Sequence, residues 1–208
     1  MSFHVERVAV LGAGVMGQGI AAHLANVGVP CYLFDIVPDE PSPDQAAKGL
    51  TLADPAVRNG PALAGLASMT KAKPPLLYRR EYASLVTPCN FSDDLDKLAE
   101  CDWIVEAVVE RLDIKHKVFA MVDEHRRPGS IVSSNTSGLS VEAMAEGRSK
   151  DFRRHFMVTH FFNPVRYMRL LEMVPCGDTD GTVFRAMADF GERVLGKGIV
   201  YAKDTPNF

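Results

Sequence analysis

The stretch Val8–Ala22, VAVLGAGVMGQGIAA, decides the fold of this chain of 208 residues. Four apolar residues at Val8–Leu11 predict a fully buried strand, and a helical pattern follows the glycine-rich turn Gly12–Gly17. In such a turn the first glycine permits the tight bend, the second lets backbone approach a pyrophosphate, and the third lets the helix pack on the strand. The sequence therefore predicts a dinucleotide site at the helix N-terminus, formed by Gly12, Gly14, Val15, Met16 and Gly17.

An acid stands where the ribose of a dinucleotide is usually bound. A second apolar run, Cys31–Phe34, ends at Asp35, where a carboxylate can accept both hydroxyls of an adenosine ribose. A carboxylate there repels a 2′-phosphate, and Ile36–Pro38 contain no arginine to neutralise one, so NAD is favoured over NADP. FAD uses the same fold and stays open. The remaining alternative is a glycine turn that binds no nucleotide.

The composition is that of an ordinary globular protein, with 47% hydrophobic and 24% charged residues. A formal net charge of −3 gives no electrostatic reason to expect nucleic acid as a partner, and no apolar stretch reaches the roughly 20 residues of a membrane span. The four cysteines form no CxxC pair, which predicts buried thiols in a reducing compartment and no metal site or disulfide framework. We expect a cytoplasmic protein, because the first strand begins too soon after Met1 for a signal peptide.

Strand and helix patterns alternate along the chain, which predicts an α/β fold of the Rossmann type with a doubly wound, mostly parallel sheet. We place this domain at residues 1–203, with a helical insertion, or arm, at 38–83 after the second strand, and the start of a linker at 204–208. Helices are expected at about 44–52 and 56–69 in the arm, then at 93–100 with Ser92 as N-cap, 113–126, 140–146 and 180–195. Further strands are expected at about 85–87, 103–108, 131–134, 156–161, 169–174 and 199–202.

The arm also carries four cations near its end, Lys71, Lys73, Arg79 and Arg80. They either attract an anionic substrate tail or belong to a solvated helical hairpin that contacts no ligand.

His160 is the histidine best placed for proton transfer. It ends an apolar strand and opens the segment His160–Pro164, and ligands of open α/β sheets bind beyond the carboxyl ends of strands. An imidazole titrates in the range that suits a base for a hydroxyl proton. The alternative is a hydrogen-bonded structural histidine.

Glu172 is the candidate partner of that base, because a carboxylate can orient an imidazole and stabilise its cation. Its apolar neighbours on a strand make an unpaired acid costly there. The turn after His160 can bring the two strands side by side. The alternative is an outward-facing glutamate on an edge strand.

Polar residues follow two other strands at the same predicted edge. Ser137 and Asn135 are suited to hold a substrate oxygen or the carboxamide of nicotinamide, and their alternative is ordinary turn and helix-cap chemistry. Glu110 and Lys115 can face the cofactor ribose, although an acid at a helix start and a surface lysine are equally natural roles.

Taken together, these motifs resemble the NAD-binding domain of L-3-hydroxyacyl-CoA dehydrogenases. The resemblance covers nearly the whole chain, and the segment HFFNP followed by Glu172 is far more specific than the glycine turn. The matching segments are Gly12–Ala21, Glu106–Glu110 with Lys115, Ser134–Ser137, His160–Pro164 and Lys203–Pro206.

The resemblance implies roles for individual residues. His160 would be the general base, Glu172 would orient it, and Ser137 would bind the substrate oxygen of an acyl-CoA thioester. The residues implied along the NAD site are Asp35, Glu110, Lys115, Asn135 and Asn163.

The chain departs from the short members of this family in two places. The segment 38–88 is longer and richer in proline, and looks more like the arm of bacterial proteins in which the dehydrogenase is fused to an enoyl-CoA hydratase. The family also continues past Lys203–Pro206 into a helical domain that completes the substrate pocket and mediates dimerisation. Since this chain stops at Phe208, we expect it to be a fragment that lacks this domain.

The activity implied is NAD-dependent oxidation of an L-3-hydroxyacyl-CoA to a 3-ketoacyl-CoA, as in fatty acid β-oxidation. Two alternatives stay open. In the first, the chain by itself is a binding module that holds NAD without turnover. In the second, the enzyme acts on a short 3-hydroxy acid without CoA.

Overall fold

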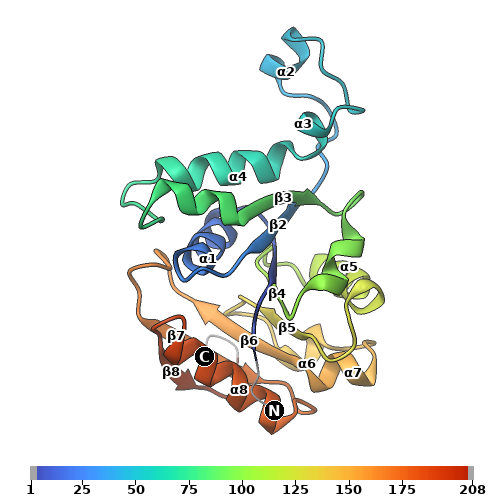
Figure 1. Ribbon diagram of the computed structural model, residues 1–208. Helices are drawn as coiled ribbons and strands as arrows, with labels where there is room; N and C mark the ends of the chain where they lie inside the picture. The colour runs from blue at the N-terminus through green and yellow to red at the C-terminus, as the bar shows by residue number, and fades with distance from the viewer. Residues whose placement is uncertain (1–3, 206–208) are drawn as a thin grey trace.

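The computed structural model describes residues 4–205, and its helices cover both faces of one sheet (Figure 1). The strand order is β3-β2-β1-β4-β5-β6-β7-β8. Strands β1 to β6 are parallel, β7 runs antiparallel to β6, and β8 is parallel to β7. The predicted doubly wound, mostly parallel α/β fold is therefore confirmed. The strands are β1 (Val8–Leu11), β2 (Cys31–Asp35), β3 (Val86–Asn90), β4 (Trp103–Glu106), β5 (Ile131–Ser134), β6 (Phe156–Phe161), β7 (Leu170–Pro175) and β8 (Gly198–Tyr201).

Two hydrophobic cores hold the helices to the sheet. One face is covered by α1 (Val15–Asn26), α4 (Gly60–Lys71) and α8 (Gly181–Arg193), and the other by α5 (Leu112–His125), α6 (Val141–Met144) and α7 (Lys150–Arg154). Because both faces are covered, β1 and β4 are buried along their whole length, which explains why β1 is a continuous apolar run.

The arm between β2 and β3 contains α2 (Pro43–Ala47), α3 (Pro55–Arg58), α4 and the 3₁₀ helix η1 (Arg80–Leu85). In Figure 1, α2 and α3 project away from the sheet, whereas α4 packs back on α1. Helix α2 begins with a capping box between Ser42 and Gln45 and is shorter than expected. The single helix expected over 56–69 is wrong, because the chain breaks at Asn59 before Pro61, which is accommodated in the first turn of a new helix.

The helix expected over 93–100 with Ser92 as N-cap is also wrong. The segment forms a shorter 3₁₀ helix, η2 (Leu95–Glu100). The side-chain oxygen of Asn90 accepts the N–H groups of Ser92 and Asp93, each at 2.9 Å, and so holds this stretch in a turn that competes with a helix start. Helix α7 was not expected. Its signal in the sequence is Ser149, whose hydroxyl accepts the N–H of Phe152.

The four cysteines are buried and free, as predicted. Among residues 4–205, no helix has both the length and the apolar character needed to cross a bilayer.

Candidate active site

The turn between β1 and α1 brings backbone atoms unusually close together. A Cβ on Gly17 would lie 1.7 Å from the carbonyl oxygen of Gly12, and one on Gly12 would lie 2.6 Å from that of Ala107. Gly12 also has φ +105°, which side chains rarely adopt. A Cβ on Gly14, in contrast, would meet nothing within 4 Å. The first and third glycines therefore permit the fold of the turn, and the second leaves its outer side open to a ligand.

The N-terminus of α1 is available to an anion. Its N-cap is Gly14, and within residues 4–205 no side chain caps it and no acid lies in its first turn. The first N–H groups of the helix and the positive end of its dipole therefore face the open side of the turn. Val15 is 65% exposed and Met16 is half-buried at this helix start.

A cavity of about 530 Å³ lies beside the turn, where β1, β2, β3 and β4 end. Two of the most exposed large apolar side chains line it, Ile36 at 63% and Val109 at 61%. Exposed apolar groups around a cavity are typical of a surface that a ligand covers. The sequence singles out Gly12, Gly14, Asp35 and the segment 108–115 among its lining residues, and it missed Phe91, Lys117 and Met121. Ile114, Lys117 and Met121 recur at helical spacing on α5, which was the available signal.

The predicted imidazole–carboxylate pair is present. Nδ1 of His160 lies 2.8 Å from Oε2 of Glu172, and both side chains are mostly buried, at 17% and 16% exposure. The two residues face each other in the antiparallel register of β6 and β7. The ring of His160 also packs against Phe162 at 4.4 Å between centroids. The carboxylate thus fixes the orientation of the imidazole, while the catalytic role of the pair stays a prediction.

Asn135 and Ser137 lie at the same edge, since they follow β5, the parallel neighbour of β6. The side-chain oxygen of Asn135 accepts the N–H of Phe161 at 2.9 Å, so this amide ties the end of β5 to the strand that carries His160. Ser137 is half-buried in the following loop, and Asn163 is exposed in the turn after β6.

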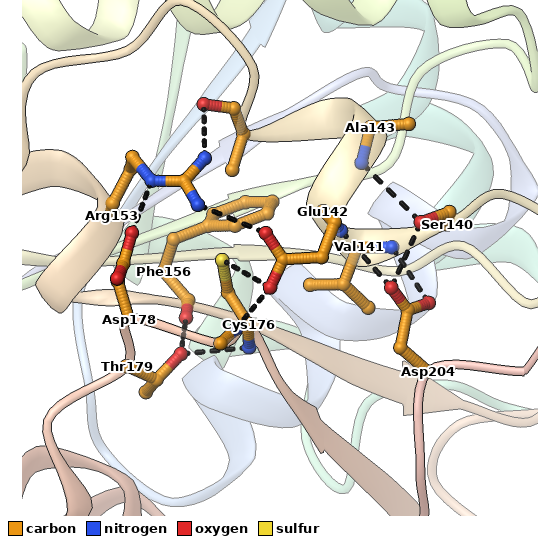
Figure 2. Close-up of polar contacts among 12 residues, drawn as sticks. Ser140, Val141, Glu142, Ala143, Arg153, Phe156, Cys176, Asp178, Thr179 and Asp204 are labelled. Carbon is orange, nitrogen blue, oxygen red and sulfur yellow. Dashed lines mark hydrogen bonds and ion pairs between the residues drawn. The ribbon is translucent and has the colours of Figure 1, made fainter.

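The loop that carries Ser137 ends on a fixed helix, α6 (Figure 2). The carboxylate of Asp204 accepts the hydroxyl of Ser140 at 2.8 Å and the N–H groups of Val141 and Glu142 at 2.9 and 3.1 Å. Asp204, which the sequence places at the start of a linker, therefore folds back onto the domain. The rest of that predicted linker from Pro206 onward, including the last residue of the Lys203–Pro206 motif, lies outside the described residues.

The side chain of Glu142 ties the start of α6 to α7 and to the segment just after β7 (Figure 2). Glu142 accepts from the N–H of Gly177 and from Arg153, at 2.9 Å for the latter. The Gly177 N–H, with further donation from Cys176 and Arg153, holds the pKa of Glu142 below its ordinary value.

Lys115 is buried rather than at the surface. Its Nζ lies 2.7 Å from both carboxylate oxygens of Glu106, with side-chain exposures of 1% and 0%. The same ammonium lies 3.2 Å from Glu110, which is about half exposed. Burial opposes ionisation of Glu110, but the hydroxyl of Thr136 and the charge of Lys115 together hold its pKa below the ordinary value. Glu110 thus joins the start of α5 to the loop that carries Ser137.

Comparison with known proteins decides the family. The family described as "3-hydroxyacyl-CoA dehydrogenase, NAD binding domain" matches residues 7–205. The chain belongs to this family. NAD is accordingly its cofactor.

Individual relatives agree with this assignment. The chain is 55% identical over its full length to a probable 3-hydroxyacyl-CoA dehydrogenase of Bacillus subtilis, of which it covers 26%. It is 33% identical to a putative fatty acid oxidation complex trifunctional enzyme of Rickettsia felis, again over its full length and 27% of that protein. Among solved structures, (S)-3-hydroxybutyryl-CoA dehydrogenase of Ralstonia eutropha matches with a TM-score of 0.79 and 26% identity, over 99% of this chain and 66% of that one. The chain thus spans about a quarter of the two curated relatives.

The residues of this chain fit NAD. The open side of Gly14 and the uncapped start of α1 suit a pyrophosphate, and the apolar cavity suits an adenine ring. Asp35 lines this cavity, and its two carboxylate oxygens accept the N–H groups of Ala13 and Ile36, each at 2.7 Å. The acid therefore fastens the glycine turn to the end of β2, and each oxygen keeps a further lone pair for a ribose hydroxyl.

Asp35→Asn is expected to weaken the discrimination between NADH and NADPH. The change removes the negative charge that repels a 2′-phosphate, so the ratio of the two dissociation constants should fall by at least about tenfold, or 1.4 kcal/mol. Quenching of the single tryptophan, Trp103, on titration of residues 1–208 with each nucleotide measures both constants. Asp39→Asn, at an exposed position outside the cavity lining, is the control. An unchanged ratio in Asp35→Asn would show that this carboxylate does not set cofactor choice.

Proposed function

We propose that the chain is the NAD-binding and base-carrying part of an enzyme that oxidises L-3-hydroxyacyl-CoA to 3-ketoacyl-CoA. The observation that carries the proposal is the 2.8 Å contact between His160 and Glu172, at the edge of the sheet where the glycine turn also lies. The names of the relatives support the substrate class.

Three residues of the chain have distinct roles in the proposed reaction. NAD supplies the hydride acceptor for C3 of the substrate. Because Glu172 engages Nδ1 of His160, Nε2 is the nitrogen that takes the proton of the 3-hydroxyl group. The resulting imidazolium is stabilised by the carboxylate of Glu172, and it holds the developing oxyanion together with the hydroxyl of Ser137.

We propose that Glu110, Lys115, Asn135 and Asn163 support the NAD site in different ways. Glu110 faces the ribose of the nicotinamide half, whereas the buried Lys115 acts through Glu110. Asn135 fixes the strand that carries the base, and the exposed Asn163 is available to the bound nucleotide.

The arm supplies a basic surface for the thioester. Lys71, Lys73 and Arg80 line a hollow of about 320 Å³ at the end of α4, and Arg79 is exposed beside it. Phosphate groups of coenzyme A are the anions that such a surface attracts.

The proposed partners lie outside the described residues. We propose that a helical domain follows residue 203, completes the pocket and mediates dimerisation, and that an enoyl-CoA hydratase domain is fused beyond it. The name of the Rickettsia felis relative and the small share of it that this chain covers support the fusion. The four free, buried thiols support the cytoplasm as the compartment.

Turnover and nucleotide binding together test this function. The natural protein that contains residues 1–208 is expected to oxidise NADH with acetoacetyl-CoA, and to use free acetoacetate at least about tenfold more slowly, because remote binding energy of the coenzyme is lost. Residues 1–208 alone are expected to bind NADH with little turnover. Equal rates on both substrates would favour a 3-hydroxy acid dehydrogenase that does not use CoA. Absent turnover with intact NADH binding would favour a binding module.

A further inference from the structure

Lys197 is a buried lysine whose ammonium group donates to backbone carbonyl oxygens. Its side chain lies in the loop between α8 and β8, and the residue is 6% exposed. Within residues 4–205 its Nζ forms no ion pair with an acid and instead donates to the carbonyl oxygens of Val165 and Met168, the latter at 2.8 Å. The ring of Phe161, next to His160, lies 5.8 Å from the ammonium. Burying an ammonium group with only neutral acceptors costs free energy of folding. Such a cost is typical of a residue with a role beyond stability.

The titratable group near Lys197 does not neutralise the charge of its ammonium. Burial lowers the pKa of Lys197 to about 8, so the amine is mostly protonated near pH 7. Nε2 of the nearby His23 donates to the carbonyl oxygen of Leu195, and burial, with the charge of Lys197, lowers the pKa of His23 to about 4. The imidazole of His23 is therefore neutral, and the two carbonyl groups are the partners that compensate Lys197.

These two carbonyl groups belong to the turn 162–169, which joins β6 to β7 and so connects His160 to Glu172. On its outer side the same turn holds the end of the arm. Arg166 donates to the carbonyl oxygens of Pro75 and Leu77 at 2.8 and 3.0 Å, and its guanidinium lies 4.3 Å from the ring centre of Tyr78. The hydroxyl of Tyr167 also donates to Pro75 at 2.9 Å.

The turn is in close contact with the nucleotide-binding helix as well. A Cβ on Gly19 of α1 would lie 2.8 Å from a methyl carbon of Val165, the residue whose carbonyl oxygen Lys197 holds. The turn 162–169 is thus fixed against α1 and Lys197 on its inner side and against the arm on its outer side.

We propose that Lys197 is a positioning residue for the dehydrogenase reaction. It acts through the turn 162–169, and sets the placement of His160 and of the basic end of the arm relative to NAD. The inference rests on the proposed function, since it assigns Lys197 to the same site. A lysine that only stabilises the fold is the competing explanation.

Lys197→Met tests the inference, because it removes the charge and the donors and keeps most of the apolar stem. In the natural full-length protein, assayed at a temperature at which the variant is folded, we expect kcat with acetoacetyl-CoA to fall by about 10–100-fold, because small misplacements of reacting groups slow the reaction. The NADH dissociation constant should stay within about twofold of the wild-type value. Lys197→Arg, which keeps the charge and donors, should recover most of the rate. Arg126→Met is the matched control, since it removes a buried guanidinium on the opposite face of the sheet.

Hydrogen exchange on residues 1–208 gives a second readout that needs no turnover. Lys197→Met should raise exchange at least about fivefold in 164–169 and 74–78 and leave 8–26 unchanged, whereas Arg126→Met should raise it in neither segment. If Lys197→Met does not fold, Lys197→Gln, which keeps one donor group, takes its place. A variant that keeps wild-type kcat, or unchanged exchange in both segments, overturns the inference. A wild-type protein without turnover contradicts the proposed function instead, and the exchange result then decides the structural claim by itself.

Discussion

Replacing His160 with glutamine is expected to lower kcat for acetoacetyl-CoA by about 10²–10⁴-fold, the usual contribution of a positioned general acid or base. Glutamine has a similar length and can accept a hydrogen bond, but it cannot carry the proton of the substrate hydroxyl. The glycine turn and the cavity beside it contain no atom of His160, so the NADH dissociation constant should change by no more than about twofold. Steady-state kinetics on the natural protein and a Trp103 fluorescence titration measure the two effects.

Glu172→Gln separates orientation from proton transfer. The amide keeps the shape of the partner at 2.8 Å from Nδ1 but loses the charge that stabilises the imidazolium, so the rate should fall by about 10-fold or more, and less than in His160→Gln. Phe162→Leu is a control for packing, since Phe162 touches the imidazole ring without a polar contact. Full activity in His160→Gln would remove His160 from the proposed chemistry even with NADH bound normally.

The imidazole–carboxylate pair shows what a sequence can predict about a site and what it cannot. An acid between apolar residues on a strand needs a partner, which predicts a paired role for Glu172. The register that places Glu172 opposite His160 depends on the path of the turn 162–169. That path is fixed by contacts with α1, the arm and Lys197, all far away in the sequence. The pairing was therefore a hypothesis until the fold was known.

An acid on a second buried strand, β4, likewise identifies the partner of Lys115. Glu106 is the last residue of a buried strand, and Glu172 lies within one, although the sequence predicts Glu106 only as part of a strand and a motif. A carboxylate that is 0% exposed requires a cation, and Lys115 is the lysine one helical turn into α5. The arm was harder to predict, because α2 and α3 project from the sheet and have few buried apolar positions to set a pattern.

The buried pair of Lys115 and Glu106 leads to a large expected effect on stability. Lys115→Met should reduce the free energy of unfolding of residues 1–208 by about 3–5 kcal/mol, the usual cost of removing one partner from a buried ion pair. The carboxylate of Glu106 would keep the N–H of Val108 and the hydroxyl of Ser134 as donors, but it would lose the ammonium that now contacts both of its oxygens. Urea unfolding followed by Trp103 fluorescence measures the change as a lower midpoint at constant slope.

Two variants distinguish charge burial from lost packing. Lys117→Met, on an exposed lysine two residues away, should change the free energy of unfolding by no more than about 0.5 kcal/mol. The double variant Lys115→Met with Glu106→Gln leaves no buried charge, so it should be more stable than Lys115→Met alone, although Glu106→Gln by itself is destabilising. Equal or greater instability in the double variant would mean that Lys115 stabilises the fold through its packed stem rather than through Glu106. A loss below about 1 kcal/mol in Lys115→Met would mean that Glu106 finds sufficient compensation in Val108 and Ser134.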